Sequence, residues 1–193
     1  LTPRAISLSD RTDLSVTAVL LSGTQGLVRL MLMQAARDRA AGLDTAGYVT
    51  GYRGSPLGSV DLAMQAAAGV LSAAQVRFHP ALNEDLAATA LWGSQQAELR
   101  GEGKYDGVFG IWYGKGPGVD RSIDVFKHAN MAGTAKHGGV IAIAADDHVA
   151  KSSTAPHQSD HVFKAAGFPT FFPSDVQGIL DMGLHAFALS RFS

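Results

Sequence analysis

The sequence contains no cysteine. That absence excludes disulfide bonds, cysteine-ligated zinc and any iron–sulfur cluster held by these 193 residues themselves. Lys and Arg number 16 against 17 Asp and Glu, and they are scattered, so we expect no nucleic-acid partner. The longest uncharged run near the start, 14–28, contains Ser, Thr, Gln and glycine, which is too polar for a membrane span. We expect a cytoplasmic protein with no membrane partner.

Three common catalytic signatures are also missing. No Gly-Lys-Ser/Thr closes a Walker loop, no GxGxxG dinucleotide fingerprint is present, and no GxSxG motif marks a serine nucleophile. Hydrophobic residues nevertheless make up 46% of the chain and charged residues 17%, which is typical of a globular protein with a sizeable core. We expect an irregular lead-in over 1–15 and one α/β domain over 16–193. Because the first residue is Leu rather than Met, we expect the translational start to lie upstream of it.

Short apolar runs alternate with helical periodicity along the chain. The alternation predicts a parallel sheet with helices on both faces. In the first helix, we expect Arg29 on the solvent face and Gly42 at the end. Residues 174–177 have the pattern of a capping box. The expected strands are 16–21, 45–52, 76–78, 107–113, 140–145 and 168–172, and the expected helices are about 24–41, 60–73, 84–99, 120–131 and 176–193.

Ligands of open α/β sheets bind at the carboxyl ends of the strands. Four features fall there: the loop after Tyr52, the helix start at Asn83, the loop after Tyr113, and the stretch from Asp146 onward. We expect the site to be assembled from these four places.

Two carboxylates, Glu84 and Asp85, follow the N-cap residue Asn83 in an otherwise apolar, Ala-rich helix. A carboxylate at the mouth of a buried helix suits acid–base chemistry. The alternative is that both residues only complement the helix dipole.

Two glycine loops flank this helix in the predicted sheet. In 51–58, glycine lets backbone amides approach a ligand and Ser55 offers a hydroxyl, although a tight turn needing positive φ is an equal alternative. The loop 114–118 has more glycine and proline than a turn requires and carries Lys115, which favours contact with a ligand. His157 and His161, with Asp146 and Asp147, invite a metal interpretation, but the spacing fits no metallohydrolase and we assign no metal ligand.

Taken together, the motifs resemble those of a known family. The chain is similar to the N-terminal region of the large fused bacterial indolepyruvate ferredoxin oxidoreductases, in the 2-oxoacid:ferredoxin oxidoreductase superfamily. The resembling stretches are GTQGLVRL at 23–30, GYRGSPLG at 51–58, NEDLAATALWGSQQ at 83–96, YDGVFGIWYGKGPGVDRS at 105–122, ADDHVAKSS at 145–153 and SDVQGILDMGLHAFALSRFS at 174–193.

The resemblance implies the pyrimidine-binding domain of a thiamine diphosphate enzyme, which has an α/β fold with a parallel sheet. The activating glutamate of the family falls on Glu84, whose role would be a hydrogen bond to N1′ of the cofactor aminopyrimidine. The residues implied to bind the cofactor are Glu84, Tyr52, Gly54, Ser55, Pro56, Gly116 and Gly118. Those implied to bind the substrate are Arg53, Ser55, Lys115 and Arg121.

Two departures from the shorter family members affect these assignments. Arg53 replaces a proline that is common in the shorter members. Those members have a Lys-His pair at the positions of Lys115 and Gly116, so glycine replaces the histidine here. The role of Arg53 is therefore open, and so is any function tied to that histidine.

Parts that such an enzyme needs are missing here. The chain has no Gly-Asp-Gly motif to hold diphosphate and Mg²⁺, and no cysteines for [4Fe-4S] clusters. The resemblance therefore implies that other domains of the same enzyme supply them, and that the isolated chain is inactive. The expected partners are those domains, ferredoxin, a 2-oxoacid and coenzyme A, in a homo-oligomer. The alternatives are a non-catalytic assembly domain of such an enzyme and an unrelated enzyme that binds a phosphate ligand.

Overall fold

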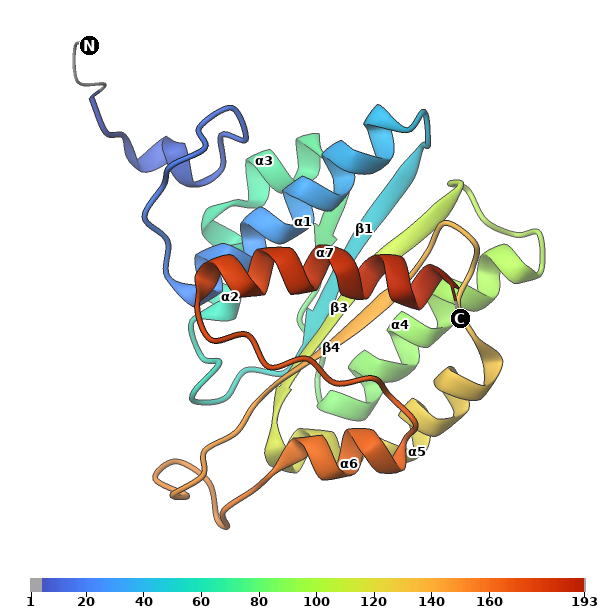
Figure 1. The fold of residues 1–193 in the computed structure, drawn as a ribbon. Helices are drawn as coiled ribbons and strands as arrows, with labels where there is room; N and C mark the ends of the chain where they lie inside the picture. Colours follow the sequence, from blue (N-terminus) through green and yellow to red (C-terminus); the bar gives the residue numbers. More distant parts are fainter. Residues whose placement is uncertain (1–4, 193) are drawn as a thin grey trace.

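The computed structural model describes residues 5–192, so part of the expected lead-in 1–15 and Ser193 lie outside the described residues. Its centre is a parallel sheet with the order β2-β1-β3-β4 (Figure 1). The four expected strands at 45–52, 76–78, 107–113 and 140–145 are confirmed, as is their parallel pairing. The observed strands are β1 (Thr45–Gly51), β2 (Val76–Phe78), β3 (Gly107–Lys115) and β4 (Val140–Ala145).

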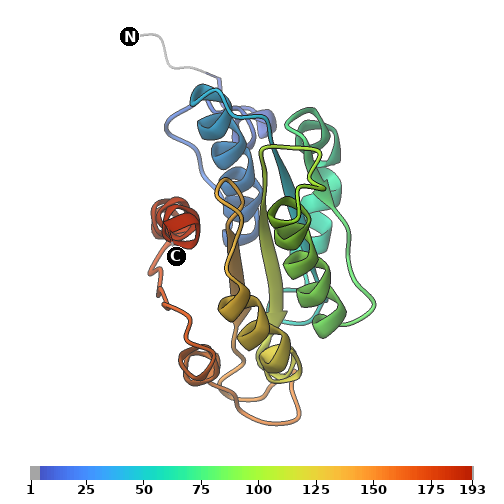
Figure 2. The same ribbon diagram turned by 90° about the vertical axis from the view of Figure 1, so that its right-hand side faces the viewer.

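Helices cover the sheet in two groups, each with its own apolar cluster. One cluster joins α1, α2, α3 and α7 to the sheet, and the other joins α4, α5 and α6 to it. Figure 2 shows α1 and α4 on opposite sides of the sheet. The helices are η1 (Leu8–Arg11), α1 (Gly23–Ala40), α2 (Val60–Ala66), α3 (Ala68–Ala73), α4 (Glu84–Leu99), α5 (Gly116–Ala132), α6 (Ser159–Ala165) and α7 (Val176–Phe192).

Strand β3 shows why two clusters form. Successive side chains of a strand point to opposite faces, so Phe109 and Ile111 enter the α1 cluster while Trp112 enters the α4 cluster. All three are at most 1% exposed. A strand buried on both faces is the usual condition of a parallel sheet covered by helices. Over residues 5–192, no helix has the length and hydrophobicity needed to cross a membrane.

The expected strand at 16–21 is wrong: these residues form no strand, and a buried arginine side chain binds the chain just before them. Arg29 is 6% exposed, contrary to its expected place on the solvent face. Its Nη2 donates to the Val16 carbonyl at 2.7 Å, and its Nη1 donates to the carbonyls of Asp10, Arg11 and Asp13 at 3.1–3.2 Å. The guanidinium group of Arg29 thus fixes the lead-in to α1 through four backbone carbonyls, one of which belongs to the first residue of the expected strand.

The expected strand at 168–172 is also wrong. The segment has no strand partner among the described residues, and Phe168 instead packs against Phe126 and Phe163, with ring centroids 5.4 and 5.9 Å away. A strand needs a partner as well as a suitable sequence, and the sequence alone does not reveal the partner.

Two helices and one helix cap differ from expectation. The helix expected at 120–131 begins at Gly116, so three of the five residues of the second glycine loop form its first turn, where Pro117 needs no hydrogen-bond partner. The helix expected at 60–73 is broken at Ala67. The capping box expected at 174–177 is wrong, because the cap of α7 comes from Asp175, whose Oδ1 accepts from the Gly178 amide at 2.7 Å. Helix α6 was not expected at all.

Candidate functional site at the carboxyl ends of the strands

The carboxyl ends of β1, β3 and β4 lie together at one end of the sheet, which is the lower end in Figure 1. Gly51 pairs with Tyr113, and Lys115 pairs with Ala145. A Cβ built on Gly51 would lie 2.2 Å from the Tyr113 carbonyl oxygen, so only glycine allows this approach. Three of the four predicted places therefore come together where the strands end.

The fourth place is the start of α4, which two hydrogen bonds fix. The Asn83 side chain accepts from the Leu86 amide at 2.9 Å, as expected of an N-cap residue. The indole Nε1 of Trp112 donates to the Glu84 carbonyl at 2.9 Å, and Trp112 is fully buried. The core of the sheet thus holds the backbone of Glu84 directly.

The Glu84 side chain lies against the backbone of Gly118. A Cβ on Gly118 would meet Glu84 Cγ at 2.5 Å and Oε1 at 2.9 Å. The Glu84 side chain is 14% exposed, whereas that of Asp85 is 41% exposed. The two neighbouring carboxylates therefore have different surroundings, and the missing side chain of Gly118 makes room for only one of them.

Arg121 stands in front of both carboxylates without binding either closely. Its Nε lies 3.9 Å from Glu84 Oε2, and its Nη1 lies 3.9 Å from Asp85 Oδ1. Its side chain is 54% exposed. An exposed pair at this distance contributes little, about 0–1 kcal/mol, so the cation is available to a ligand.

The first glycine loop is joined to the end of β3 through the loop that follows β4. A Cβ on Gly54 would lie 3.3 Å from Lys115 Cδ. Lys115 Nζ donates to the Ser152 carbonyl at 2.9 Å, and the Ser152 hydroxyl donates to the Ser55 carbonyl at 3.3 Å. Lys115 thus bridges two loops in this structure. Tyr52, Arg53, Ser55 and Pro56 are exposed on the first of these loops.

Asp147 holds together the loop that follows β4, which we call the third loop. It accepts from both the amide and the hydroxyl of Ser152. The Ser152 amide, with smaller contributions from the Ser152 hydroxyl, the Lys151 amide and the Lys115 cation, holds the pKa of Asp147 below its usual range, although desolvation opposes this. The ionised carboxylate therefore holds the loop in place.

A histidine fills the space beside Gly116. A Cβ on Gly116 would lie 2.2 Å from Cγ of His157. The imidazole is 14% exposed, with Nε2 2.9 Å from Asp120 Oδ2 and Nδ1 3.4 Å from Asp146 Oδ1. The sequence alone offers this histidine as a metal ligand together with His161. Residues 5–192 contain no group of three or more His, Cys, Asp and Glu side chains that could hold a metal.

A buried pair lies behind the site and was not expected from the sequence. The Tyr113 hydroxyl donates to Asp61 Oδ1 at 2.6 Å, and the two residues are 0% and 7% exposed. Burial first, and then the Asp61 carboxylate, raise the pKa of Tyr113 far above its ordinary value. The phenol therefore stays protonated and ties the end of β3 to α2. The two residues are 52 positions apart, so no local pattern could have revealed the contact.

The predicted site residues thus fall into two groups at one edge. Glu84, Gly118 and Arg121 form one, and Gly54, Ser55 and Lys115 form the other. Lys115 and Gly116 are adjacent in sequence, so β3 and the start of α5 connect the two groups.

Comparisons with known proteins were made at three levels. No protein-family model matches the chain, and no curated protein sequence matches it. Among solved structures, the chain is similar to a 2-oxoglutarate:ferredoxin oxidoreductase from Magnetococcus marinus with 2-oxoglutarate, coenzyme A and succinyl-CoA bound. The sequence identity is 16% and the TM-score is 0.59.

The chain shares the fold of part of that enzyme. The match covers 89% of this chain and 27% of the other, so the chain spans about a quarter of the length of the protein it matches. The predicted α/β class, with helices on both faces of a parallel sheet, is confirmed.

Proposed function

We propose that the chain is the pyrimidine-binding domain of a thiamine diphosphate-dependent 2-oxoacid:ferredoxin oxidoreductase that acts on indolepyruvate or another arylpyruvate. Two independent lines support this. The motifs at 51–58, 83–96 and 105–122 resemble those of the indolepyruvate enzymes, and the fold is similar to that of a 2-oxoglutarate:ferredoxin oxidoreductase.

The observation that carries the proposal is the position of Glu84. Its carboxyl group is mostly shielded from solvent at the carboxyl end of a parallel sheet, in the space that Gly118 leaves free. A residue that served only the helix dipole would need neither the shielding nor the glycine. This placement argues against a purely non-catalytic assembly domain.

Thiamine diphosphate, when bound, supplies the nucleophilic carbon and the electron sink for decarboxylation of a 2-oxoacid. Glu84 of this chain would hold a proton at N1′ of the aminopyrimidine, which is the acid–base role that a positioned carboxyl group can take. Tyr52, Gly54, Ser55, Pro56, Gly116 and Gly118 would line the pyrimidine side of the cofactor. Arg53, Ser55, Lys115 and Arg121 would face the substrate, with the three cations attracting its carboxylate.

The remaining parts of the reaction belong to other domains in this proposal. They would hold the diphosphate with Mg²⁺, carry the [4Fe-4S] clusters, transfer the acyl group to coenzyme A and pass electrons to ferredoxin. The enzyme would work as a cytoplasmic homo-oligomer, and this chain alone would not turn over substrate.

The test replaces each of the two adjacent carboxylates in the complete enzyme. Glu84→Gln keeps the size of the side chain and removes its ability to exchange a proton. We expect turnover to fall by about 10²–10⁴-fold, the usual contribution of a general acid or base. Asp85→Asn is the matched control, because Asp85 is more exposed and lies outside the Gly118 contact. It should change turnover by less than about threefold, as a surface substitution does.

Two readouts separate a catalytic effect from a structural one. Hydrogen exchange at C2 of the bound cofactor should slow in parallel with turnover in Glu84→Gln, while cofactor binding and thermal stability change little. Near-normal C2 exchange in this variant would refute the assignment of Glu84. Tight binding of a simple nucleotide, with no thiamine diphosphate binding by the complete protein, would instead support the unrelated phosphate-ligand enzyme.

A further inference from the structure

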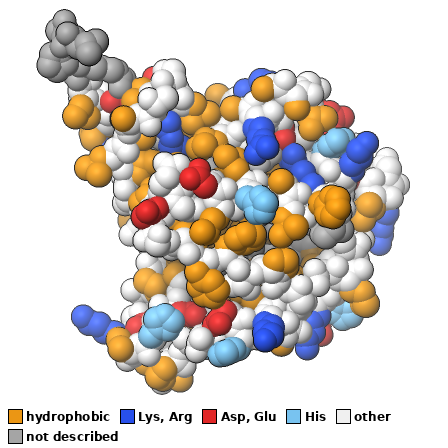
Figure 3. Space-filling model, viewed as in Figure 1, with side chains coloured by type: hydrophobic (Ala, Val, Ile, Leu, Met, Phe, Trp, Pro, Cys, Tyr) orange, Lys and Arg blue, Asp and Glu red, His pale blue; other side chains and the backbone are white. Residues whose placement is uncertain are grey.

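The first turn of α5 contacts two ionisable side chains, and each lies in space that a glycine leaves free. The Glu84 carboxyl group lies against Gly118. Two residues earlier, the His157 imidazole lies against Gly116, where a Cβ would come within 2.2 Å of Cγ and 2.5 Å of Nδ1. Any side chain at position 116 would therefore displace the imidazole. At the lower end of the molecule in Figure 3, histidine side chains lie among acidic ones.

His157 contacts α5 at two points that span this turn. Its ring lies in the space beside Gly116, and its Nε2 lies 2.9 Å from Oδ2 of Asp120, one turn further along the helix. Gly118 lies midway between the two points. A side chain that holds positions 116 and 120 therefore also fixes the backbone against which the Glu84 side chain lies.

The opposite side of the imidazole is held by residues from two other elements. Its Nδ1 lies 3.4 Å from Oδ1 of Asp146, which directly follows β4, and 3.3 Å from the hydroxyl of Ser159, the first residue of α6. The amide and the hydroxyl of Ser159 both donate to Asp146, at 2.6 and 2.5 Å. The carboxylate that faces the imidazole is thus itself fixed in place.

The contacts form a continuous path from the sheet to the site. It runs from the end of β4 through Asp146 to His157, and from His157 through the first turn of α5 to Gly118. The path ends on an exposed carboxylate, that of Asp120. Because an exposed contact between charged groups contributes only about 0–1 kcal/mol to stability, the main consequence of the His157–Asp120 contact is where the turn lies.

A hydrolytic role for this cluster does not fit its geometry. Ser159, His157 and Asp120 have the residue types of a nucleophile, a base and an acid. The Ser159 side chain is buried, however, and its hydroxyl donates to Asp146. A substrate could not reach that oxygen, and its proton is already engaged by a carboxylate. The cluster is therefore built to hold the imidazole rather than to activate the serine.

We propose that His157 is a positioning residue for Glu84 and acts through the first turn of α5. The imidazole sets the position of residues 116–120, and these residues set the space in which the Glu84 carboxyl group meets the cofactor. The inference rests on the proposed function, because it takes Glu84 as the group that acts on the aminopyrimidine.

The test is a double-variant cycle in the complete enzyme. Gly116→Ala puts a methyl group where the imidazole lies, and His157→Ala removes the imidazole. Each single variant should lower kcat by about 10–100-fold, since a misplacement near 1 Å can cost two orders of magnitude, and should change KM for the 2-oxoacid by less than about threefold. The double variant should be no slower than His157→Ala, because the methyl group then meets empty space. Losses that multiply in the double variant would overturn the proposal.

Two further variants separate positioning from folding. His157→Gln keeps a side-chain nitrogen that can donate to Asp120, and should restore most of the kcat lost in His157→Ala. His161→Ala is the matched control, because His161 lies exposed on the same α6 segment, and should change kcat by less than about threefold. A fall in activity that only follows a loss of folded enzyme would assign His157 to stability and overturn the proposal.

Hydrogen–deuterium exchange of the complete enzyme, without cofactor or substrate, gives a readout that does not depend on Glu84. The amides of residues 120–123 donate to the carbonyls of the first turn of α5. They should exchange at least about 10-fold faster in His157→Ala, whereas the amides of α1 should not change. Unchanged exchange at 120–123 would overturn the proposal, while near-normal C2 exchange in Glu84→Gln would refute the proposed function instead.

Discussion

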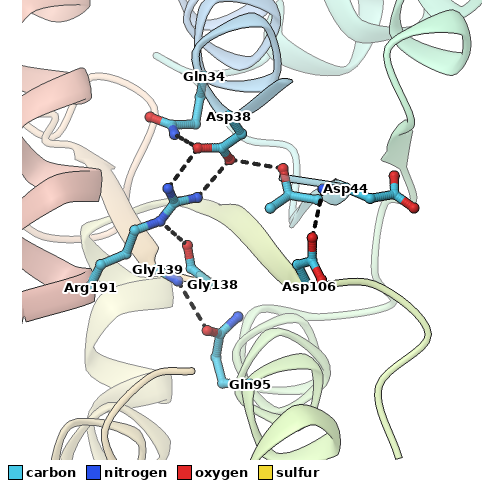
Figure 4. Close-up of polar contacts among 9 residues, drawn as sticks. Gln34, Asp38, Asp44, Gln95, Asp106, Gly138, Gly139 and Arg191 are labelled. Atoms are coloured by element: carbon cyan, nitrogen blue, oxygen red, sulfur yellow. Dashed lines mark hydrogen bonds and ion pairs between the residues drawn. The ribbon is translucent and has the colours of Figure 1, made fainter. Parts of the chain in front are cut away.

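The two ends of the sheet carry polar clusters of opposite character. At the amino end, Arg191 binds Asp38 through both terminal nitrogens, each at 2.7 Å (Figure 4). Asp38 also accepts from Gln34 and Thr45, each at 2.8 Å, and its side chain is 3% exposed. At the carboxyl end, Arg121 stays 3.9 Å from its carboxylates and is 54% exposed.

The difference separates structural charge from charge that is available for chemistry. A buried ion pair is retained when further hydrogen bonds satisfy both groups, as they do around Asp38. The Arg191 contact also joins α7 to α1, across 153 residues of sequence. By contrast, the Arg121 side chain at the other end is half-exposed and lies 3.9 Å from each carboxylate, too far for a close ion pair. We therefore propose that the carboxyl end serves function and that the amino end serves folding stability.

The largest effect should come from breaking the amino-end pair. Arg191→Met leaves the Asp38 carboxylate buried without its cation, which should lower the free energy of unfolding by about 3–5 kcal/mol. Urea denaturation followed by circular dichroism measures the change. Arg39→Met, on an exposed position of the same α1 helix as Asp38, is the control and should change the stability by less than about 0.5 kcal/mol.

A double variant sharpens this prediction. Asp38→Leu with Arg191→Met removes both charges, and should recover part of the stability lost in Arg191→Met alone. Recovery should be incomplete, because Gln34 and Thr45 lose their shared acceptor. A double variant no more stable than Arg191→Met would show that packing of the long arginine side chain, rather than the charge pair, stabilises this end.

The second-largest effect should come from adding a methyl group at Gly118, beside the Glu84 side chain. The methyl group of Gly118→Ala would sit 2.5 Å from Glu84 Cγ and must displace the carboxyl group. We expect turnover of the complete enzyme to fall by about 10–100-fold, since a displacement near 1 Å can cost two orders of magnitude. The fold should remain, because the side chain that must move lies at the edge of the site.

Gly93→Ala is the matched control for Gly118→Ala. Gly93 lies in the middle of α4, and a Cβ there meets nothing within 4 Å. Alanine in a helix is favoured over glycine by about 0.5–1 kcal/mol, so this variant should be slightly more stable and fully active. Equal turnover in Gly118→Ala and Gly93→Ala would mean that the contact between Gly118 and Glu84 has no catalytic consequence.

Sequence periodicity predicted the four strands and α4, because the residues of each element contain the pattern that is typical of a strand or a helix. Asn83 predicted the start of α4, and with it the location of Glu84. The strand predicted at 168–172 is wrong because pairing depends on a neighbouring strand that the local sequence does not reveal. The solvent-facing position predicted for Arg29 is wrong for a related reason: the hydrogen-bond partners of its side chain lie 13 to 19 residues away.

The contacts that distinguish Glu84 from Asp85 could not be predicted from the sequence either. The space beside Gly118 exists only because α5 begins next to α4, and the sequence shows just two adjacent acidic residues. His157 reaches Gly116 from a loop some 40 residues along the chain. Helix and strand patterns thus predicted which residues gather at the carboxyl ends of the strands, while tertiary packing decides which of their side chains lie close together.

The smallest effect concerns the loop that follows β4, which contains Asp147 and Ser152. The pKa of Asp147 is lowered in the folded protein, so between its folded value and its ordinary value of 3.8 the unfolded chain binds more protons. The contribution of Asp147 is therefore fully present above the ordinary pKa and is lost as the pH falls through the folded pKa. Because Ser152 also accepts from Lys115 and donates to Ser55, protonation should loosen the contact between the first and third loops.

An NMR titration of the Ser152 amide checks this prediction. The midpoint should lie below 3.8, and Asp147→Asn should abolish the transition while leaving the amide signals of α1 unchanged. A midpoint at or above 3.8 would mean that the Ser152 amide does not stabilise the carboxylate. The contact between the first glycine loop and the loop after β4 would then depend on the hydrogen bonds of Ser152 to Lys115 and Ser55 rather than on the charge of Asp147.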